Sequence, residues 1–276
     1  MSASSPLILP VAPNLPVCSI GLFDSGLGGL SVLQEVRQAL PNTPLIYLAD
    51  QAHCPYGPRS DEDIVQLSNN CTRWLLAQGA RLIVVACNSA SAAALEPLRA
   101  AYPAVPFVGM VPAVKPAAKL TQTGVVGVLA THATIQGELL NKAVEEWAQG
   151  VKVVTQVGTG LVELVEHGML QTPAARQLVQ SHLQPLLDAG VDVLVLGCTH
   201  YPFLRPIIAQ LAPQLTVLDS GAAIARRTLL LWQGLSMPDE VGDASVRYAT
   251  TGALASYQEA LQRFELPSGY SLSIQL

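Results

Sequence analysis

Two segments that lie far apart in this chain have nearly the same pattern. Leu76–Cys87 and Leu187–Cys198 each run through a helix end, a glycine stop, an apolar strand, a small residue and a cysteine. A weaker match joins Gly21–Ser25 to Gly127–Thr131. Repetition of one structural unit is typical of duplicated architectures, so we predict two related halves in tandem. Chance similarity between generic buried strands is the alternative.

The apolar runs are short. Leu82–Cys87, Gly124–Ala130 and Val193–Cys198 have six or seven residues, whereas a membrane-spanning helix needs about 20. Short continuous apolar runs are typical of strands buried on both faces, as in a parallel sheet. Half of the residues are hydrophobic and 13% are charged, which argues against long disordered regions.

Predicted strands and helices alternate along the chain, which indicates an α/β fold with parallel sheets. The predicted strands are Val17–Asp24, Leu45–Ala49, Leu82–Ala86, Phe107–Met110, Gly124–Ala130, Val151–Gln156, Val193–Leu196, Thr216–Leu218 and Val246–Thr250. The predicted helices are Gly28–Leu40, Asp61–Gln78, Ser89–Tyr102, Gln136–Gln149, Gly158–His167, Pro173–Ala189, Tyr201–Leu211, Ala222–Trp232 and Ser256–Phe264.

A chain of 276 residues is long enough for two domains. We predict two similar α/β domains related by a pseudo-twofold axis, each with a mostly parallel central sheet flanked by helices and with the active site in the cleft between them. The first comprises residues 1–113 and 219–276, and the second residues 114–218. The boundary falls in Val114–Thr121, which is rich in Pro, Ala and Lys. The tail after Leu218 has no counterpart in the repeat, and we expect it to pack back onto the first domain.

Charge and the N-terminus restrict location and partners. Met1–Leu15 has three prolines and no basic residue, unlike a secretory signal, and we interpret it as a frayed leader on a cytoplasmic protein without membrane attachment. The net charge is −5, and Lys and Arg are scattered, which argues against nucleic acid as a partner. A polar stretch is expected around Asp239–Asp243.

Polar side chains follow four of the predicted strands. They are Asp24-Ser25, Cys87-Asn88-Ser89, Thr131 and Cys198-Thr199-His200. Ligands of parallel sheets bind beyond the carboxyl ends of the strands, and free N–H groups of the following turn or helix receive anions. These groups suit a ligand that carries carboxylates. The glycines of residues 24–29 do not fit a nucleotide-binding loop, and we interpret them as a tight strand-to-helix turn.

Five cysteines are present, and no two have the C-x-x-C spacing of a metal or redox site. Cys87 and Cys198 occupy equivalent strand ends of the repeat, and we predict that these two are reactive. The helix N-termini expected after them should lower the thiol pKa values toward neutrality. We expect Cys18, Cys54 and Cys71 to be packing residues.

Two facing thiols suit a particular reaction. A hydrolase needs a single nucleophile, and a disulfide reductase keeps its thiols together. Inversion of a carbon centre by proton transfer needs a base on one face and an acid on the other. A pyridoxal phosphate enzyme would need a Schiff-base lysine. The lysines are Lys115, Lys119, Lys142 and Lys152. No lysine follows a predicted strand, so we predict a reaction without cofactor or metal.

Five motifs resemble those of the glutamate racemase family, in the aspartate/glutamate racemase superfamily. They are Phe23–Val32, Tyr47–Asp50, Pro55–Gly57, Ala86–Ala90 and Gly197–Pro202. The resemblance extends from about Ile20 to Trp232. It implies cofactor-independent interconversion of L- and D-glutamate, which supplies D-glutamate for peptidoglycan synthesis.

The resemblance also implies roles for single residues. Cys87 and Cys198 would be the acid/base thiols, with Asp24 assisting the first and His200 the second. Glu166, in the element Val165–Gly168, would support His200. The implied substrate contacts are Asp24, Ser25, Tyr56, Gly57, Asn88, Ser89, Thr131, Thr199 and His200.

Two other hypotheses stay open. The same chemistry could act on aspartate or a related amino acid. Alternatively, the chain could be a regulatory protein on a retained racemase-like fold, since some family members are associated with inhibition of DNA gyrase. That activity is tied to additional N-terminal sequence, which the short leader does not resemble. A homodimer is compatible with the sequence, which does not determine the oligomeric state.

Overall fold

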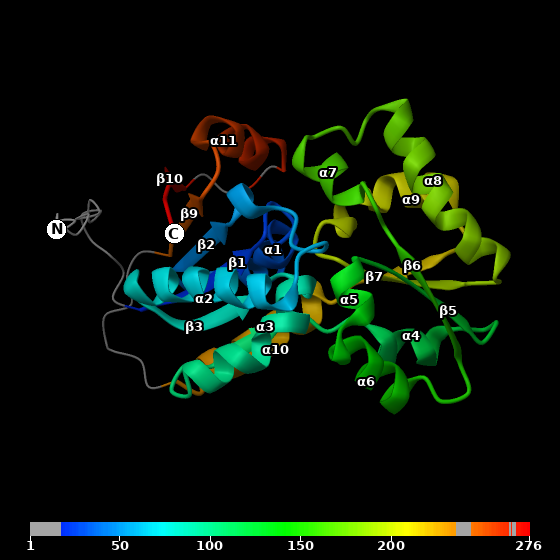
Figure 1. Ribbon diagram of the computed structural model, residues 1–276, viewed down its shortest axis with the longest axis horizontal. Coiled ribbons are helices and arrows are strands. Elements are labelled where there is room, and N and C mark those ends of the chain that lie inside the picture. Colours follow the sequence, from blue (N-terminus) through cyan, green and yellow to red (C-terminus); the bar gives the residue numbers. More distant parts are fainter. Residues whose placement is uncertain (1–17, 236–243, 265, 267–268) are drawn as a thin grey trace.

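The computed structural model has two lobes, each built on a parallel sheet (Figure 1). The structure describes residues 18–235, 244–264, 266 and 269–276. The predicted leader, Met1–Leu15, and the predicted polar stretch, Asp239–Asp243, lie outside these residues.

The first lobe contains a six-stranded sheet in the order β10-β9-β2-β1-β3-β4. Its strands are β1 (Ser19–Asp24), β2 (Leu45–Ala49), β3 (Ala80–Val85), β4 (Phe107–Gly109), β9 (Val246–Thr250) and β10 (Tyr270–Ser273). Its helices are α1 (Leu30–Ala39), α2 (Asp61–Ala77), α3 (Asn88–Ala101), α10 (Gly221–Gln233) and α11 (Leu254–Arg263), with the short 3₁₀ helix η1 (Gln51–His53).

The second lobe contains a four-stranded sheet in the order β6-β5-β7-β8. Its strands are β5 (Val125–Ala130), β6 (Lys152–Val157), β7 (Val193–Gly197) and β8 (Thr216–Leu218). Its helices are α4 (Val114–Leu120), α5 (His132–Gln136), α6 (Glu138–Trp147), α7 (Leu161–Glu166), α8 (Pro173–Asp188) and α9 (Arg205–Leu211), with the 3₁₀ helix η2 (Tyr201–Leu204).

The two sheets share one strand order. In chain order, each lobe places its first strand between its second and third, with the fourth beyond the third, and the pairs are parallel. The repeated segments end in β3 and β7, the third strands, and the weaker match joins β1 to β5, the first strands. The predicted fold, two similar lobes with parallel sheets, is therefore confirmed.

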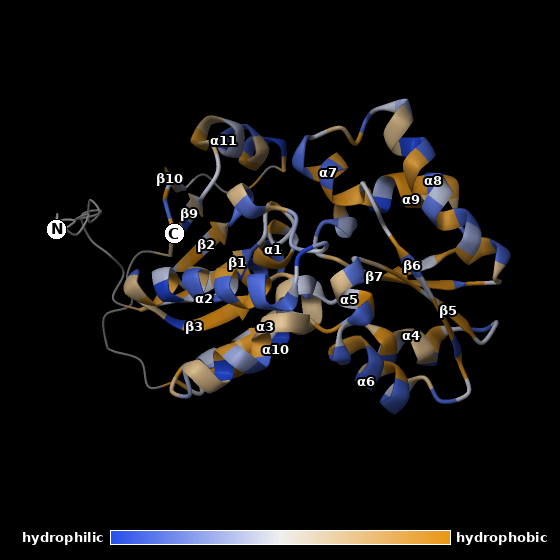
Figure 2. Cartoon of the chain, viewed as in Figure 1, coloured by the Kyte–Doolittle hydropathy of each residue, from blue (hydrophilic) through white to orange (hydrophobic). Residues whose placement is uncertain are grey.

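Burial explains why these runs form strands. All residues of β1, β2 and β7 are buried, and the apolar colouring in Figure 2 is concentrated on the strands and on the helix faces toward them. The tail packs onto the first lobe as predicted: β9 pairs with β2, β10 pairs with β9, and α10 lies against α1.

Residues Val114–Leu120, at the predicted boundary, form the helix α4, and Pro116 falls in its first turn, where proline is tolerated. Two local predictions were wrong. The helix predicted from Gln136 begins instead at Glu138, because the backbone at Gly137 is extended (φ −69°, ψ 143°), and the preceding helix α5 was not predicted. Tyr201–Leu211 divides into η2 and α9, each with a proline in its first turn.

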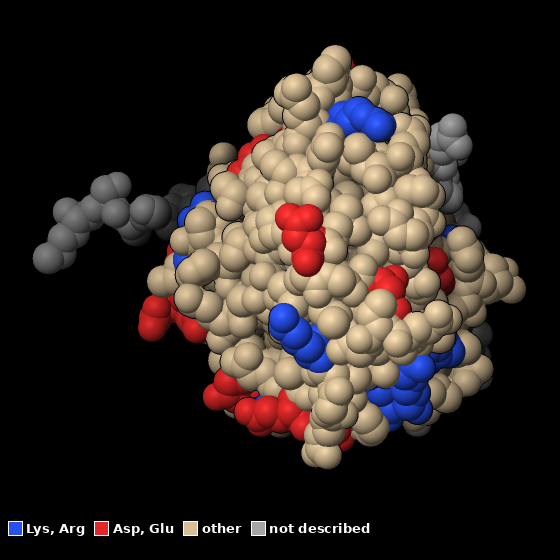
Figure 3. Space-filling model, turned by 90° about the vertical axis from the view of Figure 1, so that its right-hand side faces the viewer, with Lys and Arg blue, Asp and Glu red and all other residues tan. Residues whose placement is uncertain are grey.

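Within the described ranges, the helices are too short or too polar to cross a bilayer. On the face seen in Figure 3, basic and acidic side chains lie in small separate groups on a mostly uncharged surface.

Candidate active site

Cys87 lies where β3 gives way to α3. Its backbone is extended (φ −139°, ψ 125°), and its sulfur caps the helix by accepting a hydrogen bond from the Ala90 N–H at 3.5 Å. The thiol can donate to Ser25 Oγ at 4.0 Å. The side chain is nearly enclosed at the carboxyl end of its strand, with 4% exposure.

Cys198 follows β7 directly and is 6% exposed. A turn follows it, and the helical segment predicted from Tyr201 begins at that residue as the short 3₁₀ helix η2. Its neighbour in the turn is His200, whose Nδ1 lies 3.8 Å from the Cys198 sulfur. The polar group beside this thiol is therefore the His200 imidazole and not the N-terminus of a helix.

The electrostatics of Cys87 differ from the prediction. Burial raises the pKa of the Cys87 thiol well above its usual value, and the charge of Asp24 acts in the same direction. The charge of Cys198 raises it further, while the Ala90 N–H lowers it. The prediction that the pKa of Cys87 falls toward neutrality is wrong, because the effect of desolvation on this pKa is larger than that of the helix N-terminus.

Asp24 and Asn88 present buried atoms without partners. Asp24 ends β1, and its Oδ2 accepts from the Gly29 N–H at 2.7 Å. Its Oδ1 and both amide atoms of Asn88 have no hydrogen-bond partner among the described residues. A buried polar atom left unpaired costs about 1–3 kcal/mol. Such atoms at strand ends are suited to the polar groups of a ligand.

His200 and Glu166 form a tight pair between α7 and the turn after β7. His200 Nε2 lies 2.6 Å from Glu166 Oε1, and Leu27 N–H and Gln51 Nε2 also donate to this carboxylate. Burial alone would raise the pKa of Glu166, but these hydrogen bonds outweigh it and lower the pKa. Burial would likewise lower the pKa of His200, yet hydrogen bonds with Cys198, Cys54 and Glu166 raise it well above its usual value.

Hydroxyl groups meet where the lobes touch. Ser89 Oγ of α3 lies 2.9 Å from Thr131 Oγ1, and Thr131 lies 2.9 Å from Thr134 Oγ1. A Cβ on Gly57 would stand 3.0 Å from the Cβ of Thr131, so only glycine fits here without displacing its neighbour. The structure therefore brings together Gly57, Ser89 and Thr131, which the resemblance placed among the substrate contacts.

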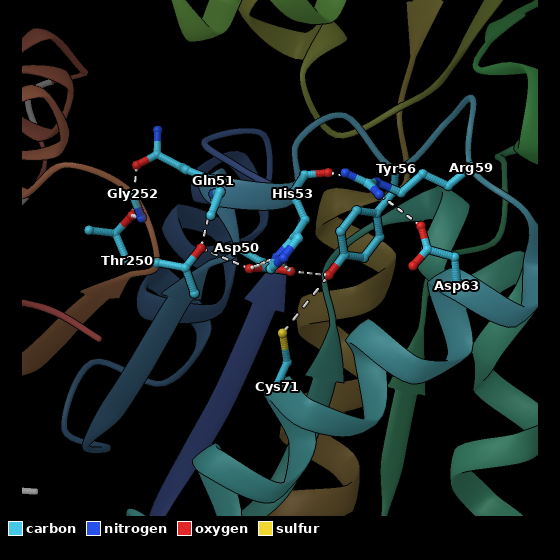
Figure 4. Close-up of polar contacts among 11 residues, drawn as sticks. Asp50, Gln51, His53, Tyr56, Arg59, Asp63, Cys71, Thr250 and Gly252 are labelled. Carbon is cyan, nitrogen blue, oxygen red and sulfur yellow. Dashed lines mark hydrogen bonds and ion pairs between the residues drawn. The ribbon is translucent and has the colours of Figure 1, made fainter. Parts of the chain in front are cut away.

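Tyr56 has a different environment from the one expected. Its hydroxyl donates to Asp50 Oδ2 at 2.6 Å (Figure 4). Asp50 is fully buried and also contacts His53 Nδ1 at 2.9 Å and Thr251 Oγ1 at 2.8 Å. The hydroxyl is thus committed to Asp50. Sequence reasoning assigned Asp50 no role, although it directly follows β2 as the other candidates follow their strands.

Two further residues next to the site were missed. Gln51 donates to Glu166 Oε2 at 3.0 Å and accepts from Thr250 Oγ1 at 2.8 Å, which connects β9 to the site. Cys54, predicted to be a packing residue, has its sulfur within 4.8 Å of ligand atoms of Glu166 and His200. No local signal distinguished Cys54, whose neighbours come from the other half of the chain.

Cavities of about 220 and 180 Å³ are lined by both lobes. The larger reaches Asn88, Cys198 and Thr199, and the smaller reaches Gly57 and Thr131. Two duplicated α/β lobes that present one buried thiol each, with unpaired polar atoms beside them, are typical of an enzyme that moves protons on and off a small polar substrate.

Comparison with known proteins agrees with this class. Residues 24–228 match the Asp/Glu/Hydantoin racemase family. A glutamate racemase of Roseiflexus sp. is 50% identical over 251 residues, which cover 90% of this chain and 92% of that protein. The chain belongs to the Asp/Glu/Hydantoin racemase family and, within it, to the glutamate racemases.

Solved structures resemble the chain over nearly its whole length. A Bacillus anthracis glutamate racemase isoform has a TM-score of 0.82 and 32% identity, and covers 94% of this chain and 98% of its own. The Escherichia coli glutamate racemase in complex with L-glutamate and the activator UDP-MurNAc-Ala has a TM-score of 0.83 and 33% identity, with 94% and 99% coverage. The family resemblance seen in the motifs is confirmed.

Proposed function

We propose that this glutamate racemase interconverts L- and D-glutamate with Cys87 and Cys198 as its two acid/base groups. The observation that carries this assignment is the equivalence of the two thiols. Each follows the third strand of its sheet, and each is buried.

The reaction balances as two proton transfers. One sulfur, as thiolate, takes the proton from Cα and leaves the electron pair on the carbon, where the adjacent carboxylate delocalises it. The other sulfur, as thiol, gives its proton to the opposite face. The product has the inverted configuration, and the protonation states of the two thiols are exchanged.

The residues around the two thiols have different roles in the proposed reaction. Cys87 lies beside Asp24 and is held as a thiol in the free enzyme by burial and by that charge, which raise its pKa. Cys198 lies beside His200, whose pKa is raised by hydrogen bonds with Cys198, Cys54 and Glu166. His200 can therefore donate to the Cys198 sulfur when that sulfur is negative, and Glu166 orients the ring.

Substrate binding uses the unpaired atoms. Asp24 Oδ1 is the proposed partner of the substrate ammonium, and the Asn88 amide pairs with a carboxylate and the ammonium. The hydroxyls of Ser25, Ser89, Thr131 and Thr199, with the backbone at Gly57, are proposed to hold the carboxylates. Tyr56 contributes by fixing the loop through Asp50, since its hydroxyl is already bonded there.

Single replacement of the thiols tests the assignment. We expect Cys87→Ser and Cys198→Ser each to lower kcat by about 10²–10⁴-fold, because a serine hydroxyl is a far weaker acid. The double variant should be little worse than the poorer single one, since the two groups act as a unit. Cys18→Ser, at a buried cysteine that directly precedes β1, is the matched control. Wild-type rates in both single variants would refute the assignment.

Substrate choice, location and assembly are separate questions. We expect a much higher kcat/KM for glutamate than for aspartate, and comparable values would favour a broader substrate range.

A supercoiling assay with DNA gyrase tests the regulatory alternative. A cytoplasmic location, where D-glutamate would enter peptidoglycan synthesis, and a homodimer are proposed on the family resemblance alone. Fractionation and sedimentation would test them.

A further inference from the structure

Cys54 is a third cysteine at the site, and the proposed reaction does not use it. It follows η1 in the first lobe, whereas Glu166 ends α7 and His200 follows β7 in the second lobe. One ligand atom of each residue, a sulfur, a carboxylate oxygen and an imidazole nitrogen, lies within 4.8 Å of the other two. Thiolate, imidazole and carboxylate are the ligands that Zn²⁺ prefers in proteins.

Glu166 and His200 need to move little to form part of a tetrahedral site. With metal–ligand bonds of about 2.0–2.3 Å, ligand atoms in such a site lie about 3.3–3.6 Å apart. Glu166 Oε1 and His200 Nε2 are 2.6 Å apart, so they need to separate by only about 0.7 Å to admit a cation. The cation then takes the position of the proton that Glu166 Oε1 and His200 Nε2 share.

The cluster is also enclosed. The backbone of Gly26 lies against it, and a Cβ at that position would overlap Glu166 Oε1 and stand 3.0 Å from the Cys54 sulfur. His200 is buried and Glu166 is nearly so. A cation here would be shielded from water on most sides, which strengthens its interaction with the two anionic ligands.

We propose that Cys54, Glu166 and His200 bind a thiophilic divalent cation and that this binding inhibits the enzyme. Cys54 belongs to one lobe and the other two ligands to the other, so the cation ties the lobes together. Because Cys87 and Cys198 are 4% and 6% exposed, glutamate reaches them only when the lobes separate. The cation also removes the proton that His200 shares with Glu166.

Binding releases a thiol proton. Burial raises the pKa of Cys54 to about 11, although His200 acts in the opposite direction. The thiol is therefore protonated at neutral pH, and the proton passes to the buffer as the sulfur coordinates the metal.

The test measures Zn²⁺ affinity in the full chain carrying Cys87→Ser and Cys198→Ser, by competition with a chromophoric chelator. These replacements remove the two nearby thiols and make the binding result independent of the proposed proton transfer. Adding Cys54→Ser should weaken Zn²⁺ binding by at least about 10–100-fold. Adding Cys18→Ser instead should leave it unchanged. Equal affinities with and without Cys54 would overturn the proposal.

Inhibition and spectroscopy supply independent readouts. With the active chain, Zn²⁺ should inhibit the parent and Cys18→Ser but not Cys54→Ser, each compared with its own rate in metal-free buffer. Co²⁺ bound to the double variant should show a thiolate charge-transfer band that Cys54→Ser removes. Inhibition that persists in Cys54→Ser would place the cation on other ligands and contradict the proposal.

Discussion

The protonation state of His200 is set by the side chains that surround it. Burial opposes the charged ring, but hydrogen bonds with Cys198, Cys54 and Glu166 outweigh burial and raise the pKa of His200. Glu166 is itself held ionised by donors from Leu27 and Gln51. These contacts fix the ring against a carboxylate on one side and direct its Nδ1 at the Cys198 sulfur on the other.

Glu166→Gln removes the charge of this carboxylate and keeps its size. We expect kcat to fall about 10–100-fold with a smaller change in KM, as for other residues that orient a catalytic group. Loss of the anion lowers the pKa of His200. The limb of the pH–rate profile on which activity falls with rising pH should therefore shift to lower pH.

Glu163→Gln, on the exposed side of the same helix, serves as the control for the pH–rate measurement. Its profile should coincide with that of the parent chain. A Glu166→Gln profile that does not shift would show that Glu166 has only a structural role.

The loop after η1 and the start of α5 bring the two lobes into contact. Gly57 lies against Thr131, and the hydroxyls of Ser89 and Thr131 meet across the interface. Close approach of these elements requires the absence of a side chain at position 57. The loop is supported from behind by Tyr56 and Asp50, and through Thr251 by the end of β9.

Gly57→Ala tests this contact. A Cβ 3.0 Å from that of Thr131 would hold the lobes apart, so we expect a higher KM and a kcat/KM lowered about tenfold, within the range for small displacements of positioning elements. The melting temperature should change little. Gly234→Ala is the control, because a Cβ there would stand 3.5 Å from the Leu231 carbonyl oxygen, an ordinary contact distance. Equal kinetics for the two variants would contradict the role of Gly57.

Asp192 holds the turn between α4 and β5. Its carboxylate accepts hydrogen bonds from Thr121 Oγ1 and from the N–H groups of Gln122 and Thr123. Although burial acts in the opposite direction, these bonds lower the pKa of Asp192 from 3.8 to about 2. A depressed carboxyl pKa stabilises the fold above the unfolded value, and this contribution is lost as the pH falls toward 2.

Asp192→Asn should therefore destabilise the protein by about 1 kcal/mol at pH 7, after allowance for the exposure of the site. The difference from the parent should narrow between pH 4 and pH 2. Denaturant unfolding of both chains over this range measures it. A difference that stays constant with pH would show that the charge of Asp192 does not contribute.

Local pattern determined much of the secondary structure. Buried strands such as β1, β2 and β7 were predictable because short apolar runs suit parallel sheets, and the cysteines that follow β3 and β7 were found through the repeat. Strand β10 was not predicted from the sequence, because half of its residues are exposed and it lacks a continuous buried apolar run. Asp50 and Cys54 acquire their neighbours only when segments distant in sequence meet, so no local pattern revealed their place at the site.

At the scale of the whole molecule, the two sheets support the division into domains that the sequence predicts. We propose the boundaries at 113/114 and 218/219. Helix α4, after the first boundary, packs against α6 and β7, and α10, after the second, packs against α1 and β4. Each domain then contributes one thiol, and the chain crosses between the domains twice.

Racemisation in D₂O measures directly whether two groups, one on each face of Cα, remove and add its proton. The thiols exchange their protons with solvent, so a two-thiol enzyme should place deuterium in the newly formed D-glutamate. The remaining L-glutamate should stay unlabelled early in the reaction, and the reverse direction should behave in the same way. Deuterium appearing in remaining substrate as fast as in product would indicate a single base and contradict the assignment of Cys87 and Cys198.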